Sequence, residues 1–229
     1  MTVPPRFVEV SHPIEPGMLT YPGLPVPRAE TVLDYASSHP HYQGQAEFFI
    51  GSLHLCGNTG TYVDSPVHRF RGAADLAGLP LTSLAHLPAV RVDAFDLREG
   101  RGIGPHVFAG LDLNGCAVLF HTGWSRHWRT PRYFDPNPFL TAQACDALLA
   151  AGVRFVGIDS LNIDDTQDPS RPAHTKLLGA GVPICEHMTN LENVPFRGGF
   201  LHAVPIAWAG GASFPVRAYV LELPKTPSA

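Results

Sequence analysis

The sequence contains little charge, and the charge it has is not grouped. Only 16% of the residues are Asp, Glu, Lys or Arg, the formal net charge is −4, and neither sign forms a long run. A protein that binds nucleic acid or an anionic membrane through electrostatics needs a basic patch. The sequence therefore gives no reason to expect either partner, and a small-molecule partner is expected instead.

Long apolar runs and paired cysteines are also missing. No stretch approaches the ~20 apolar residues that a membrane-spanning helix requires, and the start MTVPPRFVEV lacks the basic and apolar regions of a secretory signal. The four cysteines include no Cys-x-x-Cys pair. Cys116 and Cys185 lie in apolar, strand-like runs, which favours buried reduced thiols over a disulfide framework. Together these features predict a cytoplasmic protein.

What the chain does have is apolar residues, proline and histidine. Its 229 residues are 45% apolar, which is enough for the core of a single domain over residues 1–229. The 23 prolines predict many loops. The 12 histidines, nearly as many as Lys and Arg together, justify a search for a metal or acid–base site.

Short apolar segments alternate with helical ones along the chain. Thr141 is a plausible N-cap for a helix that Gly152 would end. This alternation predicts an α/β domain with a mixed sheet. Strands are expected at residues 6–10, 46–55, 89–95, 116–121, 154–159, 182–186 and 216–221, and helices at 141–151 and 173–179.

Residues 52–70 carry the clearest chemical pattern. Pro66 separates Asp64 from His68 and disfavours a continuous helix through them. A carboxylate and an imidazole on one rigid turn can bind a divalent metal or orient a water. The string Asp-x-Pro-x-His also fits an aspartate that caps a turn followed by a surface histidine. Taken alone, the string favours this second interpretation.

The wider pattern Gly-Thr-Tyr-Val-Asp-Ser-Pro-Val-His at residues 60–68 resembles the signature of the cyclase family, which includes bacterial kynurenine formamidases and isatin hydrolases. That signature reads His-x-Gly-Thr-His-x-Asp-x-Pro-x-His. Further segments resemble the family in the same order along the chain, at residues 21–23, 122–124, 157–159, 174–179, 182–186, 190–191 and 213–218.

The resemblance implies a swivelling β/α/β-like fold and a metal-dependent hydrolase of an amide C–N bond. It assigns Asp64, His174 and Glu186 as metal ligands and His68 as the acid–base residue. Tyr21 matches an aromatic residue that lines the family's substrate pocket. Family members commonly form homo-oligomers, so a homodimer or homotetramer is expected.

Two positions depart from the family signature. Asn58 and Tyr62 stand where the family has histidines that belong chiefly to one of two neighbouring metal positions. A neutral amide is a weaker ligand for zinc than imidazole, and tyrosine must lose a proton of pKa about 10 to bind strongly. The expected cofactor is therefore one divalent metal, Zn or Mn, rather than two, with Asn58 and Tyr62 as pocket residues.

Other histidines and aromatic residues offer alternatives. His54 is a candidate for a displaced ligand, although its spacing favours an ordinary strand histidine. His187 would face away from Glu186 if both residues lie in a strand. Phe48 and Trp124 are candidates for an aromatic wall, with core packing the better interpretation of Phe48. Structural, capping or pocket-edge roles are expected for His121, His127, Asp159 and Asp164.

The implied reaction is hydrolysis of an aryl formamide such as N-formylkynurenine, with a metal-activated water and His68 transferring the proton. Two alternatives remain open at this stage. The chain could hydrolyse a different cyclic amide or a lactone, with Tyr62 donating a hydrogen bond where the family has a metal. It could also be a metal-free member that binds a small ligand without catalysis.

Overall fold

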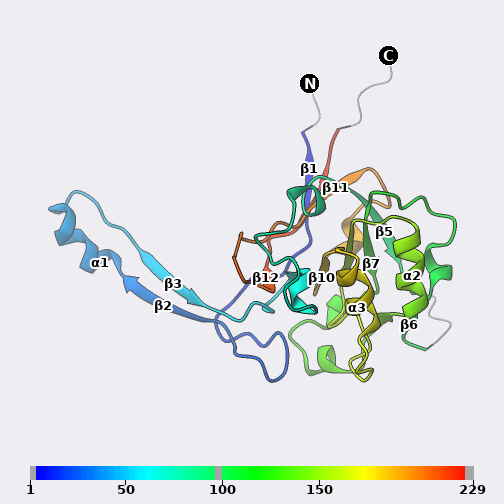
Figure 1. The fold of residues 1–229 in the computed structure, drawn as a ribbon. Helices are drawn as coiled ribbons and strands as arrows, with labels where there is room; N and C mark the ends of the chain where they lie inside the picture. The colour runs from blue at the N-terminus through cyan, green and yellow to red at the C-terminus, as the bar shows by residue number, and fades with distance from the viewer. Residues whose placement is uncertain (1–3, 96–99, 225–229) are drawn as a thin grey trace, which may run out of the picture.

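The computed structural model describes residues 4–95 and 100–224. Its main element is a nine-stranded mixed sheet with the order β1-β13-β11-β5-β7-β9-β10-β4-β12, shown in Figure 1. The strands are β1 Arg6–Glu9, β4 Tyr62–Asp64, β5 Leu87–Asp93, β7 Ala117–His121, β9 Phe155–Ile158, β10 Ile184–Glu186, β11 Gly199–His202, β12 Ser213–Pro215 and β13 Tyr219–Glu222.

The centre of the sheet is parallel and its flanks are antiparallel. β5, β7, β9 and β10 pair in parallel, and α2 (Ala142–Ala150) and α3 (Pro172–Gly179) are the helices of the crossovers on either side of β9. Both helices cover one face, because Leu148 and Leu177 pack in the same buried cluster as Val118 and Phe120 of β7. A mixed α/β sheet is therefore confirmed.

The opposite face carries a second core. Side chains alternate across a strand, so Ala117 and Leu119 of β7 face this second cluster, together with Phe155 of β9. Here the sheet is covered by its own flanks and by the loop after β4, which contributes Leu76 and other apolar side chains. Two cores on two faces hold the central strands rigidly, and β10, β4 and β12 continue the sheet to one edge.

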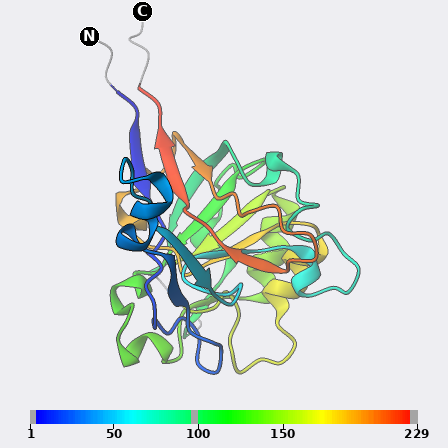
Figure 2. The ribbon, with the colours of Figure 1, turned by 90° about the vertical axis from the view of Figure 1, so that its left-hand side faces the viewer.

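A separate hairpin projects from this body, as Figures 1 and 2 show. It runs over residues 28–54, which we call the arm. β2 (Arg28–Leu33) and β3 (Ile50–His54) pair in an antiparallel two-stranded sheet. α1 (Tyr35–Ser38) and the 3-10 turn η1 (His39–Tyr42) connect them. Asp34 caps α1 by accepting a hydrogen bond from the Ser37 amide.

The remaining elements are short. β6 (Gly102–Ile103) and β8 (Phe139–Leu140) form a two-residue parallel ladder. The other 3-10 turns are η2 Pro66–His68, η3 Leu81–Ser83, η4 Pro105–Phe108, η5 Trp124–His127, η6 Pro131–Phe134 and η7 Leu191–Asn193. Within the described residues, no helix is long and apolar enough to cross a membrane.

The predicted elements are present with shifted ends. Thr141 caps α2 through the Ala144 amide as expected. The strand predicted at 216–221 begins only at Tyr219, and that predicted at 46–55 begins at Ile50. β2, β4, β11 and β12 were not predicted; β4 and β12 are three residues long, too short to show a periodic pattern. All four cysteines are free thiols, as expected.

Close packing around β9 leaves no room for a side chain at Gly157. A Cβ on Gly157 of β9 would lie within 3 Å of the Met188 sulfur and of Leu119. Gly157→Ala should therefore lower the free energy of unfolding by about 1–3 kcal/mol, through overpacking. Chemical denaturation measures this.

The matched control is Gly51→Ala, another strand glycine. Its Cβ would meet only the end of the Phe49 ring at 3.3 Å. This substitution should be neutral or stabilising by up to about 0.5 kcal/mol, because alanine loses less entropy on folding. Equal destabilisation by both variants would contradict the packing described for β9.

Candidate active site

The register of three short strands gathers four polar side chains on one face. β4 pairs with β10 so that Glu186 lies opposite Tyr62, and with β12 so that Ser213 lies opposite Asp64. Residues directly opposite, or two apart on one strand, share a face. Tyr62, Asp64, Glu186 and Ser213 therefore point to the same side, and all four are buried.

His68 joins this group through the turn that follows β4. Pro66 starts η2, and the tight turn brings His68 Nδ1 to 3.8 Å from Asp64 Oδ1. The Ser213 hydroxyl connects the two, because it donates to Asp64 Oδ1 and lies 3.1 Å from His68 Nδ1. A hydroxyl has one proton. With that proton on Asp64, His68 Nδ1 must donate to Ser213, which leaves His68 Nε2 as a proton acceptor.

His174 comes from the first turn of α3, and Asp164 fixes its orientation. The Asp164 carboxylate accepts from the backbone amides of Ala173 (2.6 Å) and His174 (3.1 Å), which satisfies the start of the helix. Asp164 Oδ2 also accepts from His174 Nδ1 at 2.6 Å. This contact directs His174 Nε2 toward Asp64 and Glu186. The expectation that Asp164 serves in capping and hydrogen bonding is confirmed.

Two carboxylate oxygens lie near the same nitrogen of His174. His174 Nε2 lies 3.8 Å from Asp64 Oδ2 and 3.8 Å from Glu186 Oε1. These separations are too long for hydrogen bonds, yet shorter than twice the ~2.1 Å bond of zinc to nitrogen or oxygen. Asp64 Oδ2 is buried and has no hydrogen-bond partner among the described residues. Donor atoms of Asp64, His68 and His174 also lie within 4.8 Å of one another.

The charges around His174 favour a cation. Burial lowers the pKa of His174, but the hydrogen bond to Asp164 and the nearby charges of Glu186 and Asp64 outweigh it and raise the pKa to about 10. Burial raises the pKa of Asp64, but the neighbouring His68 and His174 outweigh it, so the net shift is downward. The buried carboxylate of Asp64 thus lies beside His174, where a positive charge is favoured.

Tyr62 and Glu186 are hydrogen-bonded to each other beside His174. The Tyr62 hydroxyl donates to Glu186 Oε2 at 2.5 Å, and the Ile163 amide donates to Oε1 at 2.7 Å. Burial, with the charges of Glu186 and Asp64, raises the pKa of Tyr62 well above its ordinary value. Burial likewise raises the pKa of Glu186 to about 7. Tyr62 therefore stays protonated and acts as a donor to Glu186.

These groups open into a pocket of about 450 Å³. The lining includes every proposed site residue except Asp64, which is fully buried. One wall is apolar and comes from the loop that carries Tyr21. The lining residues are Tyr21, Pro22, Gly23, Leu24, Asn58, Tyr62, His68, Arg69, Asn162, Arg171, His174 and Glu186.

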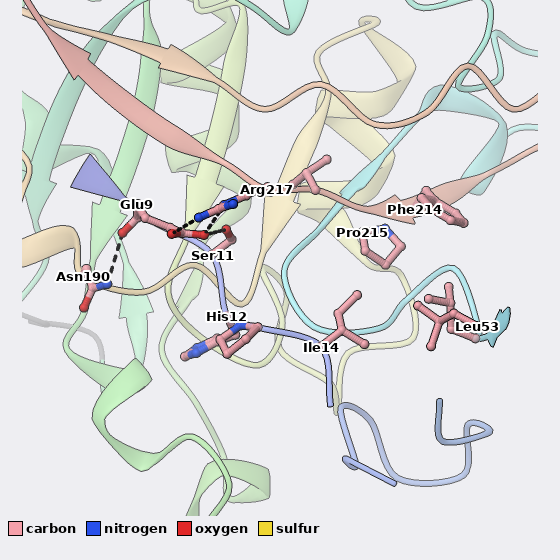
Figure 3. Close-up of a pocket in the computed structure, with 12 residues that line it drawn as sticks. Glu9, Ser11, His12, Ile14, Leu53, Asn190, Phe214, Pro215 and Arg217 are labelled. Carbon is pink, nitrogen blue, oxygen red and sulfur yellow. Dashed lines mark hydrogen bonds and ion pairs between the residues drawn. The ribbon is translucent and has the colours of Figure 1, made fainter. Parts of the chain in front are cut away.

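A larger groove of about 950 Å³ lies elsewhere, at the base of the arm. Figure 3 shows that its acidic residue, Glu9, is already paired with Arg217; the nitrogen–oxygen distances are 2.9 and 3.0 Å. The groove therefore has no free carboxylate beside a ligand-type nitrogen. The smaller pocket, with its converging donors, is the better candidate for chemistry.

Several alternatives from the sequence are wrong. His54 is an exposed arm residue beside Glu30, at 3.9 Å, and is no displaced ligand. Phe48 is neither core nor pocket wall, because it is half-exposed on the arm against Tyr42. Trp124 lies outside the pocket lining, and its indole donates to the Tyr133 carbonyl.

His187 does not continue the strand after Glu186. β10 ends at Glu186, and His187 has a φ of 55°. Its ring is fully buried and contacts the Tyr133 hydroxyl at 2.9 Å, and burial lowers its pKa to about 3. His187 therefore remains a neutral packing residue beside Tyr62, with ring centroids 5.2 Å apart.

Comparison with known proteins agrees with this geometry. The family model described as "Putative cyclase" matches residues 8–165. The chain belongs to the cyclase family. Among relatives of this cyclase-family chain, the kynurenine formamidase of Salinibacter ruber (strain DSM 13855 / M31) is 30% identical over 221 residues, covering 95% of this chain and 98% of the relative.

Solved structures show the same fold. A protein from Bacillus stearothermophilus described as a predicted metal-dependent hydrolase is 28% identical, with a TM-score of 0.75 over 96% of this chain and 100% of that one. Isatin hydrolase A from Ralstonia solanacearum has a TM-score of 0.81 and 23% identity, covering 95% and 92% of the two chains. The cyclase-type fold expected from the sequence is thus confirmed.

Sequence reasoning missed Ser213 as a site residue. Its hydroxyl joins Asp64 and His68, although 145 residues separate Ser213 from His68. The family resemblance at residues 213–218 marked the segment but gave this serine no role. Only the pairing of β12 with β4 brings it opposite Asp64.

The support of His174 by Asp164 can be tested by stability. Asp164→Ala removes the acceptor of two helix-start amides and of His174 Nδ1, and should cost about 2–4 kcal/mol of unfolding free energy. Asp168→Ala, an exposed aspartate of the same loop, should change stability by about 0.5 kcal/mol at most. Thermal or chemical unfolding that did not separate the two variants would contradict the role given to Asp164.

Proposed function

We propose that this chain is a metal-dependent hydrolase of an amide C–N bond, with aryl formamides such as N-formylkynurenine as its substrates. The observation that carries the proposal is the buried, unpartnered oxygen of Asp64, which lies 3.8 Å from His174 Nε2. The likeness to the Salinibacter ruber kynurenine formamidase over nearly the whole of both chains supports it. The pocket beside that oxygen, lined by His68, His174 and Glu186, gives a substrate access to the site.

Asp64, His174 and Glu186 would hold one divalent cation. Two carboxylates and an imidazole suit Zn or Mn, and the orphaned Asp64 oxygen and the two 3.8 Å separations fit a shared cation. Such a cation, when bound, polarises a carbonyl and makes a coordinated water more acidic. Tyr62 donates its proton to Glu186 and so cannot serve as a further ligand, which favours one metal over two.

His68 transfers the proton in this proposal. Ser213 accepts from His68 Nδ1, so His68 Nε2 is free to take a proton from water. The same nitrogen then delivers that proton to the leaving amine. His68 belongs to the pocket lining and is more exposed than His174, which suits a group that meets both water and substrate.

The apolar wall at Tyr21, Pro22 and Leu24 is suited to an aryl ring. Asn58 lines the pocket near Tyr62 and offers an amide for hydrogen bonds to the substrate. The enclosed floor, made of Asp64, His174 and Glu186, would then lie beneath the scissile amide.

A metal-binding measurement distinguishes the proposed hydrolase from the alternative, a metal-free protein that binds a small ligand without catalysis. After dialysis against zinc or manganese and removal of free metal, the protein should retain about one metal per chain by elemental analysis. Asp64→Asn removes the carboxylate charge at constant size and should weaken metal affinity at least about tenfold. Asp168→Asn is the control and should retain metal normally. Failure of the unsubstituted protein to retain metal would favour the binding protein.

Catalysis tests His68 separately. His68→Ala should lower kcat for an aryl formamide about 10²- to 10⁴-fold, because proton transfer is lost, while metal content stays near one per chain. His121→Ala, which removes a histidine paired with Asp93 at 3.0 Å, is the control and should retain kcat. Normal turnover by the His68 variant would remove its acid–base role. Faster hydrolysis of lactones or cyclic imides than of formamides would instead support the alternative substrates.

A further inference from the structure

Two arginines line the mouth of the candidate pocket. Arg69 directly follows His68, and Arg171 directly precedes α3. Neither forms an ion pair within 4.0 Å with an acidic side chain of the described residues. Their positive charge is therefore available to a ligand in the pocket.

Neutral groups hold both guanidinium groups in place. Arg69 Nε donates to Thr175 Oγ1 at 3.1 Å, and Arg171 Nη1 donates to Asn162 Oδ1 at 3.2 Å. Each arginine has five N–H donors, so most remain for a ligand. Because the acceptors are uncharged, they position the two groups without neutralising them.

The position of Arg171 is coupled to the candidate metal site. Asn162 Oδ1 also accepts from the backbone amide of Asp164 at 3.0 Å, and Asp164 holds His174. Arg171 has a φ of 48°, in the left-handed region that a residue with a side chain rarely adopts. The loop thus fixes Arg171 and His174 together.

We propose that Arg69 and Arg171 bind a carboxylate group of the substrate. The inference rests on the proposed function and narrows its substrates to aryl formamides that carry an acid. Guanidinium groups bind carboxylates through paired hydrogen bonds. A substrate therefore enters with its formamide toward His68 and its carboxylate at the mouth.

Two substrates that differ only in a carboxylate group test whether Arg69 and Arg171 bind that group. The metal-loaded protein should hydrolyse 2-formamidobenzoate with a higher kcat/KM than formanilide. Arg69→Gln or Arg171→Gln should lower kcat/KM for 2-formamidobenzoate about 10- to 100-fold, mainly through KM, since a charge-assisted hydrogen bond is lost. The ratio of kcat/KM for 2-formamidobenzoate to that for formanilide should therefore fall in both variants. Arg154→Gln, an exposed arginine outside the pocket lining, is the control.

Binding without turnover separates this inference from the proposed function. Titration calorimetry with 2-aminobenzoate and with aniline should show preference for the acid, and the preference should fall in both arginine variants. Equal affinity of the unsubstituted protein for the two compounds would overturn the carboxylate site but would not contradict the proposed hydrolase activity. Arginine-dependent binding of 2-aminobenzoate without hydrolysis of any formamide would support the carboxylate site and contradict the hydrolase.

Discussion

The carboxylate of Asp64 is the group on which the rest of the site depends, because it is fully buried and one of its oxygens has no hydrogen-bond partner in the part of the chain that the structure describes. Leaving a buried charged oxygen unpaired is costly. The Ser213 hydroxyl donates a hydrogen bond to the other oxygen only. The nearest positive group to the free oxygen is His174. A cation shared by these groups would complete the arrangement.

Most of the surrounding structure serves to keep that arrangement in place. Two apolar cores hold the central strands, and β4 is fixed between β10 and β12. Asp164 ties the start of α3 to the loop after β9 and orients His174. Tyr62 donates a hydrogen bond to one oxygen of Glu186. That oxygen is therefore less available to a second cation.

The sequence predicted the central strands and both main helices because each has a repeating apolar pattern or a cap, as at Thr141. The residues of the candidate site came from the order of family motifs. The pattern did not reveal Ser213, because its role depends on strand register rather than on neighbours in the chain. It predicted one strand of the arm, at residues 46–55, but not β2 or the projecting hairpin, because both arm strands are exposed along almost their whole length. Arg69 and Arg171 became notable only when the pocket placed them together.

The position of a bound metal tests the central claim most directly. Crystals grown with zinc should give one anomalous peak per chain at the zinc absorption edge, at about 2.0–2.2 Å from Asp64 Oδ2, His174 Nε2 and Glu186 Oε1. The account predicts that Tyr62 keeps its hydrogen bond to Glu186 in those crystals. Zinc bound elsewhere, with the free oxygen of Asp64 still facing no cation, would contradict it.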